Sequence, residues 1–259
     1  MESNTQKLAV PVAIVIAGAL VAVAVYFVGI NKPAGTNTGT NAVVTKIRDV
    51  QKDDHVLGNP NAQVKIVEYS DPECPFRKQF QNTLHQVIDA YGAAGKVSWT
   101  YRHWPISQLH PKGHKEAEAF ECAAAQGGND MFWKYADQVF AITTSNNSLD
   151  IGVYNSPKTA PTDASGQPYY TQKTPRSQTD AGQLSDIAVS LGLDKAKFES
   201  CLAAGTYKSR IDKDTAEALA AGGQGTPFSI VIVGKEQVPI DGAQSYETVK
   251  GLIDTMLKK

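Results

Sequence analysis

Apolar and polar residues alternate along this chain in a pattern that predicts a definite series of strands and helices. Residues 64–69 (VKIVEY) are rich in β-branched side chains, which is typical of a strand. Between Arg77 and Tyr91 apolar residues recur every three or four positions, which predicts a helix that glycine then ends. Residues 97–104 predict a second strand before a proline.

The remainder of the pattern is helical until a closing pair of strands and a last helix. Helices are predicted at residues 115–126, 131–142, 180–191, 195–204 and 208–221. Strands are predicted at residues 228–233 and 237–240, and the final amphipathic helix at 246–257. This order predicts an α/β protein of thioredoxin-type layout with helices inserted in its middle, at about residues 107–205.

Residues 143–179 interrupt the helical stretch with a polar, proline-containing segment. A loop of this length without structure is uncommon inside a compact domain. We therefore predict a surface insertion here, to which the sequence assigns no role.

Residues Leu8 to Ile30 carry no charged side chain and predict a transmembrane helix ahead of the domain. As a helix they would extend roughly 34 Å, enough for a bilayer core of about 30 Å. We interpret residues 1–30 as a cytoplasmic start and uncleaved signal anchor, with Tyr26 and Phe27 near the outer interface. A cleaved secretory signal is the alternative. Residues 31–52 then predict a flexible linker, and residues 53–259 a domain held outside the cell membrane.

Composition narrows the class of protein. The chain has 259 residues, 42% of them hydrophobic, which suits one domain of about 200 residues plus extra segments. Its net charge of −1 gives no electrostatic argument for a nucleic-acid partner. Three cysteines lie in the part predicted to be exported, where disulfides are permitted. One pair and one free thiol is the simplest count.

Cys74 is the strongest candidate for chemistry, because it lies between a strand and a helix and Pro75 follows it. Proline suits the first helical position, since it has no N–H to leave unpaired. The N-terminus of a helix favours a thiolate and can lower the pKa of a cysteine to about 3.5–7.5. We therefore predict a reactive thiol; an ordinary turn cysteine is the alternative.

Arg77 occupies the position three residues after Cys74, where a two-cysteine redox motif has its second thiol. On a helix this places it on the same face as Cys74, where its charge would favour the thiolate. It cannot resolve a mixed disulfide, so release of a substrate must await an outside thiol. A solvated helix residue without a role is the alternative.

Two further positions suit such a site. Thr226-Pro227 precedes an apolar strand, and a cis bond there would expose the backbone of Thr226 to an extended substrate; a trans turn is the alternative. Glu68, in the first apolar strand, could be a buried acid with a raised pKa that relays protons. Its alternative is a side chain that points to solvent.

The other two cysteines, Cys122 and Cys201, lie on apolar faces of the helical block. They can form a disulfide that closes a loop of about 80 residues, or remain two buried free thiols. The five histidines have no zinc-ligand spacing with cysteine, and none stands out as the base of a Cys/His hydrolase. We expect no metal and no cofactor.

The motifs together resemble the DsbA-like thiol:disulfide oxidoreductases, in their membrane-anchored or secreted bacterial form. The resemblance runs from Asp54 to the C-terminus, and the segments that carry it are residues 57–62 (LGNPNA), 64–70, 71–76 (DPECPF), 102–105 (RHWP) with His110, Phe132-Trp133 and 225–228 (GTPF). It implies a thioredoxin fold, a nucleophilic Cys74 and a buried acid at Glu68. It also implies a substrate groove at Pro75, Phe76, Arg77, Thr226 and Pro227, and a structural disulfide between Cys122 and Cys201.

Arg77 departs from the family pattern, which has the resolving cysteine there. We therefore predict an extracytoplasmic oxidoreductase or isomerase that acts on exported proteins through Cys74 alone, with an external thiol or redox partner. The alternative is a redox-impaired domain that binds unfolded exported chains in the manner of a chaperone. Glutathione-dependent isomerisation is a third class, and the predicted export argues against it.

Overall fold

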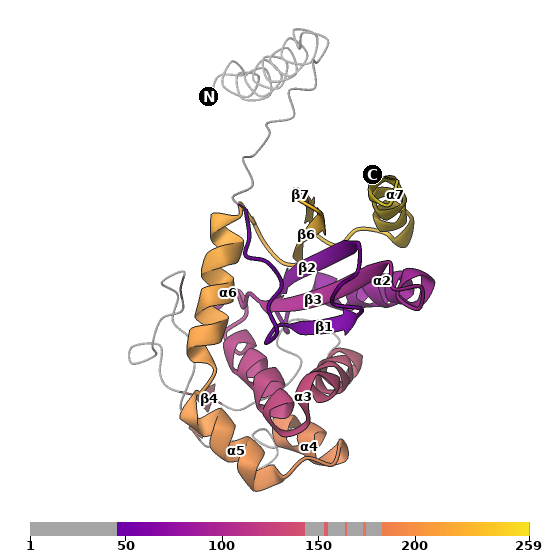
Figure 1. The fold of residues 1–259 in the computed structure, drawn as a ribbon. Coiled ribbons are helices and arrows are strands. Elements are labelled where there is room, and N and C mark those ends of the chain that lie inside the picture. Colours follow the sequence, from indigo (N-terminus) through magenta and orange to yellow (C-terminus); the bar gives the residue numbers. More distant parts are fainter. Residues whose placement is uncertain (1–45, 143–152, 155–163, 165–172, 175–182, 259) are drawn as a thin grey trace, which may run out of the picture. The chain divides into compact units, whose positions relative to one another are not determined.

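A mixed β-sheet is the centre of the domain (Figure 1). The computed structural model describes residues 46–142, 153–154, 164, 173–174 and 183–258. Within them the sheet has the strand order β1-β3-β2-β6-β7. Its strands are β1 (His55–Gly58), β2 (Val64–Ser70), β3 (Val97–His103), β6 (Phe228–Val233) and β7 (Glu236–Asp241). Only β2 and β3 run parallel; the other neighbours are antiparallel. This is the thioredoxin-like α/β arrangement that the element order predicts.

Helices cover both faces of this sheet. On one face lie α2 (Pro75–Tyr91) and α7 (Tyr246–Met256), and on the other α6 (Lys208–Ala220). The helical block consists of α3 (Gly113–Ile142), α4 (Gln183–Ser190) and α5 (Lys195–Ala204). Inside α3 the helical backbone is interrupted at Gly128, whose φ of 68° favours glycine. The prediction of two separate helices in this region is therefore confirmed.

The strand β2 faces two separate cores, because its side chains alternate between the faces of the sheet. Val64 and Ile66 belong to the core shared with α2 and α7. Val67 and Tyr69 belong to the core beside α6. Glu68 follows the alternation of Ile66, so its carboxyl group is directed into the α2 side of the sheet.

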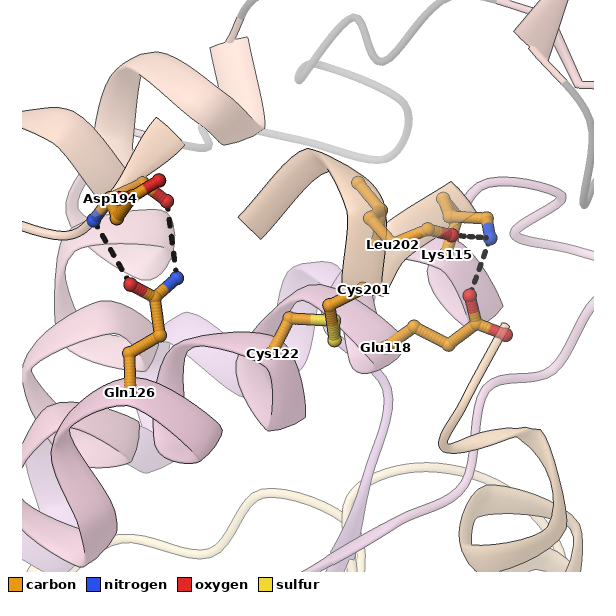
Figure 2. The surroundings of a disulfide bond; sticks show 7 residues. All are labelled: Lys115, Glu118, Cys122, Gln126, Asp194, Cys201 and Leu202. Atoms are coloured by element: carbon orange, nitrogen blue, oxygen red, sulfur yellow. Dashed lines mark hydrogen bonds and ion pairs between the residues drawn. A yellow bond between two sulfur atoms is a disulfide. The ribbon is translucent and has the colours of Figure 1, made fainter. Parts of the chain in front are cut away.

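A disulfide joins α3 to α5 in the helical block (Figure 2). Cys122 and Cys201 are bonded, with their Cα atoms 5.8 Å apart, so the pair that the resemblance implies is present. Farther along α3, Gln126 accepts a hydrogen bond from the backbone N–H of Asp194 and donates one to its carbonyl. The buried Lys115 donates to the carbonyl of Leu202, 2.8 Å away, on the other side of the disulfide.

The folded unit begins earlier than the sequence indicated. We predicted a flexible linker up to residue 52, but Ile47 is buried in the core beside α6. Arg48 pairs with Asp214 and Glu217 of α6. These contacts hold residues 46–52 on the domain. The strand β1 was also missed, because its four residues are too few to show a period.

The predicted anchor at residues 8–30 and the linker up to residue 45 lie outside the described residues. So does most of the insertion at 143–179, for which we predicted no secondary structure. Its described part contains the antiparallel pair β4 (Val153–Tyr154) and β5 (Lys173–Thr174), which corrects that prediction. Among the described helices, none is long and apolar enough to cross a membrane.

Candidate active site at Cys74

Cys74 caps the N-terminus of α2, opposite a cis-proline loop. Its backbone is extended, with φ −66° and ψ 124°, and Pro75 occupies the start of the helix as the sequence indicates. The Thr226-Pro227 peptide bond is cis. The thiol of Cys74 donates a hydrogen bond to the Thr226 carbonyl, with Sγ 3.2 Å from the oxygen. Two segments far apart in the chain therefore meet at one thiol.

The surroundings of Cys74 favour the protonated thiol. Cys74 is only 7% exposed, and this burial raises its pKa above the ordinary value. The side chain of Thr226 and the backbone N–H groups of Phe76 and Arg77 lower the pKa of Cys74 in part, while the charge of Asp71 raises it. The predicted lowering of the Cys74 pKa is therefore wrong: loss of hydration outweighs the helix N-terminus.

Arg77 lies in the protein interior and not on the substrate side of the helix. It is fully buried, and its Nε atom is 3.2 Å from Oε1 of Glu68. Its guanidinium carbon lies 4.2 Å from the ring centre of Phe140 and 5.0 Å from that of Tyr101. The solvated helix residue is thus excluded, and so is a guanidinium exposed to substrate. Arg77 influences Cys74 through its backbone N–H.

Glu68 is the buried acid that the resemblance implies, and it has a charged partner. It is fully buried, and its Oε2 accepts a hydrogen bond of 2.9 Å from the indole N–H of Trp99. Burial raises the pKa of Glu68, while the charge of Arg77 and the Trp99 N–H lower it in part. Neither Oε1 of Glu68 nor Nε of Arg77 has an aligned hydrogen bond. Their contact is therefore mainly a pairing of charges.

The interaction continues from Arg77 toward α3. Arg77 donates a hydrogen bond to the Gln81 side chain, which in turn donates to Asp137 on α3. His85 lies 2.9 Å from the same Asp137 carboxylate. The helix that carries Cys74 is thereby joined to the helical block by polar contacts as well as by packing.

Asp71 connects the Cys74 loop with the segment that follows β3. Its Oδ1 accepts from the backbone N–H of Glu73 at 2.9 Å, and its Oδ2 accepts from that of Ile106 at 2.7 Å. The His110 ring also lies 2.7 Å from Oδ2. The sequence indicates Asp71 and His110 only as members of motifs. The partners of Asp71 lie far along the chain, so no local pattern could have revealed this role.

A pair of buried carboxyl groups, those of Glu73 and Glu116, lies next to this connection. Burial and the charge of Asp71 raise the pKa of Glu73 to about 7. Burial and the charges of Glu73 and Asp71 raise the pKa of Glu116 well above its usual value. Glu73 accepts from the backbone N–H of Lys112 at 2.9 Å, whereas neither carboxyl oxygen of Glu116 has a hydrogen-bond partner among the described residues. The pair retains a proton at neutral pH, because two buried carboxylates repel.

Comparison with known proteins agrees with this geometry. The crystal structure of Pseudomonas aeruginosa DsbA2 is 25% identical to this chain, with a TM-score of 0.57, and the match covers 80% of this chain and 96% of that one. BdbD from Bacillus subtilis shares the fold at 20% identity, with a TM-score of 0.60 and coverage of 83% and 99%. Residues 50–255 match the family described as thioredoxin. The chain belongs to the DsbA-like thioredoxin-fold family.

A curated relative extends well beyond the matched region. The Na(+)/H(+) antiporter NhaA 1 of Mycolicibacterium gilvum is 36% identical over 87 residues, which are 34% of this chain and 13% of that protein. The DsbA-like chain thus corresponds to a small part of the length of that relative.

Most of the predicted site residues of this DsbA-like chain come together. Pro75 and Phe76 are exposed at the start of α2, Phe76 with 63% of its surface, and Thr226 is half-buried across the thiol. Pro227 is buried behind Thr226, and Arg77 lies beneath with Glu68. Within the described part of the chain, no group of three or more His, Cys, Asp or Glu side chains is placed to hold a metal ion.

Proposed function

We propose that this DsbA-like chain performs thiol–disulfide exchange through Cys74 as its only reactive thiol. One observation carries the proposal: the Cys74 thiol lies at a helix N-terminus, 3.2 Å from the carbonyl that precedes a cis-proline. An extended substrate chain can pair with the backbone at Thr226 while one of its sulfur atoms meets Cys74. The relationship to DsbA2 supports the same class of chemistry.

The chemistry of a single thiol is disulfide shuffling. The Cys74 thiolate attacks one sulfur of a substrate disulfide, the bond to that sulfur forms, and the other sulfur leaves as a thiolate that takes up a proton. The thiolate of a second exported thiol then attacks the bound substrate sulfur, a new substrate disulfide forms, and Cys74 leaves and is reprotonated. No net oxidation occurs. Disulfide exchange without net oxidation is the reaction of an isomerase. The outside thiol releases the substrate, as the second cysteine does in a two-cysteine motif.

The raised pKa of Cys74 sets the pace of both steps. Little thiolate is present at neutral pH, so attack is slow. A thiolate of high pKa is also a poor leaving group, so the mixed disulfide persists until an outside thiol arrives.

The test follows the mixed disulfide directly. The reduced full chain is mixed with a peptide that contains one disulfide, and mass spectrometry measures the adduct at Cys74 and its release by added glutathione. We expect an adduct on the wild type that glutathione removes, and none on Cys74→Ser. No adduct on the wild type would contradict the proposal.

A binding function of the chaperone type is the second candidate, and the exposed Phe76 beside a mainly protonated thiol favours it. An apolar ring at this place can hold an apolar segment of an unfolded chain without bond exchange. Under this function Cys74→Ser binds unfolded peptide as well as the wild type does, whereas Phe76→Ser binds it less. If the protein performs only thiol–disulfide exchange, Phe76→Ser should still form the peptide adduct at Cys74.

We further propose that the domain acts outside the cytoplasm, anchored in the cell membrane by residues 8–30. The Cys122–Cys201 disulfide supports this, since structural disulfides persist in oxidising compartments. Protease added to intact cells should remove the domain while a cytoplasmic control protein survives. If the domain is protected in intact cells and digested only after lysis, the proposal is wrong.

A further inference from the structure

Arg77 stands where a resolving thiol would lie, yet its side chain contacts an acid and not the sulfur. We propose that Arg77 removes Glu68 from proton exchange with Cys74, so that the Cys74 proton enters and leaves only on the Thr226 side of the site. This inference rests on the proposed function and defines how its thiol is ionised. It makes Arg77 a positioning residue, because it acts through Glu68.

The charge of Arg77 cannot be removed by deprotonation, since a guanidinium stays protonated in proteins. Protonation of Glu68 would leave this cation in the interior without a counter-charge, and unpaired buried charges are costly. The nearby faces of Phe140 and Tyr101 attract the guanidinium but supply no full negative charge. The charge of Arg77 therefore opposes protonation of Glu68, against the effect of burial.

Several polar and titratable groups face Glu68, and their roles differ. They are Ser70 on β2, Arg77 and His85 on α2, and Trp99 and Tyr101 on β3. Of these groups, Arg77 lowers the pKa of Glu68 most strongly, against the rise caused by burial. The charge of Arg77 does not depend on pH. Without this guanidinium, burial would raise the pKa of Glu68 further, and the carboxyl group would take up a proton more readily.

The proton of the Cys74 thiol has a defined acceptor close to the protein surface. The thiol donates to the Thr226 carbonyl, and Thr226 is half-buried at the surface. The titratable group that faces Cys74 from its own loop is Asp71, which is fixed by Glu73, Ile106 and His110. Both carboxyl oxygens of Asp71 are engaged by these partners, so Asp71 is not free to carry the proton. Solvent or a substrate thiolate at Thr226 must do so.

The experiment measures the rate at which iodoacetamide alkylates Cys74, as a function of pH, in the full chain. Cys122 and Cys201 are bonded to each other, so Cys74 is the thiol that reacts. Four proteins are compared: the wild type, Arg77→Met, the double variant Glu68→Gln/Arg77→Met, and Lys78→Met. Lys78→Met is the matched control, because it removes a neighbouring cation of α2 without touching Glu68.

We expect one ionisation in the profiles of the wild type and Lys78→Met. Arg77→Met should show two, because the freed Glu68 titrates and its charge then opposes the Cys74 thiolate. The double variant should return to one. A loss of helix stability alone would not produce a second ionisation that disappears with Glu68.

A single ionisation in Arg77→Met, or two in the double variant, overturns the inference. If Arg77→Met does not fold, the wild type and the double variant still decide: two ionisations in the former and one in the latter would show that Glu68 takes part despite Arg77. Difference infrared spectra of Arg77→Met against the double variant should contain the band of a protonated carboxylic acid at neutral pH. Alkylation needs no exchange partner, so this result is independent of whether Cys74 forms mixed disulfides with peptides.

Discussion

At the scale of single residues, the buried arginine decides the character of the site. Its position in the sequence shows only that it shares a helix face with Cys74. The structure adds that the side chain reaches inward to Glu68, 3.2 Å away, and leaves the thiol to the backbone N–H groups. The guanidinium also lies 4.2 Å from the ring of Phe140, which belongs to α3 and is far along the chain.

Replacement of Glu68 and replacement of Arg77 should lower the free energy of unfolding by different amounts. Glu68→Gln leaves a buried guanidinium that cannot be neutralised, and we expect a loss of about 3–5 kcal/mol in the free energy of unfolding. Arg77→Met should cost less at acid pH, because Glu68 can take up a proton. Its cost should grow as the pH rises above about 4.3, where the unfolded chain ionises this group first. Urea unfolding measures both values.

The double variant Glu68→Gln/Arg77→Met is the control for this asymmetry. We expect it to regain most of the stability that Glu68→Gln loses, since both charges are gone. Equal losses in the two single variants at every pH would contradict the assignment of an ionised pair.

The carboxyl groups of Glu73 and Glu116 should make the stability depend on pH. The pKa of Glu73 is raised from 4.5 to about 7, so the unfolded chain releases this proton first as the pH rises. The free energy of unfolding should therefore fall between about pH 4.5 and pH 7, by on the order of 3 kcal/mol for this shift alone. Glu116→Gln should reduce this fall, because it removes the facing carboxyl group. Thermal unfolding across this range measures it.

The exposed Glu199→Gln is the matched control for that measurement. Its side chain is 46% accessible and lies 3.9 Å from Lys195, so the pH dependence should remain that of the wild type. A fall of the same size in Glu116→Gln and in the wild type would show that another group is responsible.

At the scale of elements, the disulfide fixes α5 against α3 where the packing of short helices is limited. The bond closes a segment of 79 residues, which includes the long insertion. In the chain-entropy model such a loop corresponds to about 4.5 kcal/mol. Cys122→Ala/Cys201→Ala should therefore lose up to about that amount. Chemical unfolding measures the loss, and Cys74→Ala is the control that keeps the bond.

The variant Cys122→Ala/Cys201→Ala also tests whether the helical block affects the active site. Cys74 and Thr226 are placed by α2 and by the loop before β6, neither of which contains the disulfide. The alkylation profile of Cys74 should thus stay unchanged in Cys122→Ala/Cys201→Ala under native conditions. A shifted profile would show that the block controls the ionisation of the thiol.

At the scale of the whole molecule, the described segment before β1, residues 46–52, is part of the folded domain. Ile47 is 2% exposed, and Arg48 pairs with two acidic residues of α6. A chain that starts at residue 43 should keep the stability of the domain. A chain that starts at residue 50 lacks the buried Ile47 side chain, and its free energy of unfolding should be lower by at least about 2 kcal/mol for this reason alone. Thermal unfolding of the two fragments tests this, and Arg48→Gln isolates the ion pairs.

The sequence by itself determined the order of the elements, because the period of apolar residues records which side of each strand or helix is buried. It placed β2, α2, β6 and α7 within a few residues of their observed bounds. It also singled out Cys74 and the Thr226-Pro227 loop, while the pairing of Cys122 with Cys201 was implied by the family resemblance and left open by the residues alone. Short β1 had too few residues to show a period.

Only the tertiary structure decided the charges at the site. The pKa of Cys74 depends on how completely it is buried, and the partners of Asp71, Glu68 and Arg77 come from segments remote in the chain. The electrostatic effect of a charge depends on its distance and on the loss of water around it, and local sequence specifies neither. That is why the thiol could be found from the sequence, while its protonation state could not.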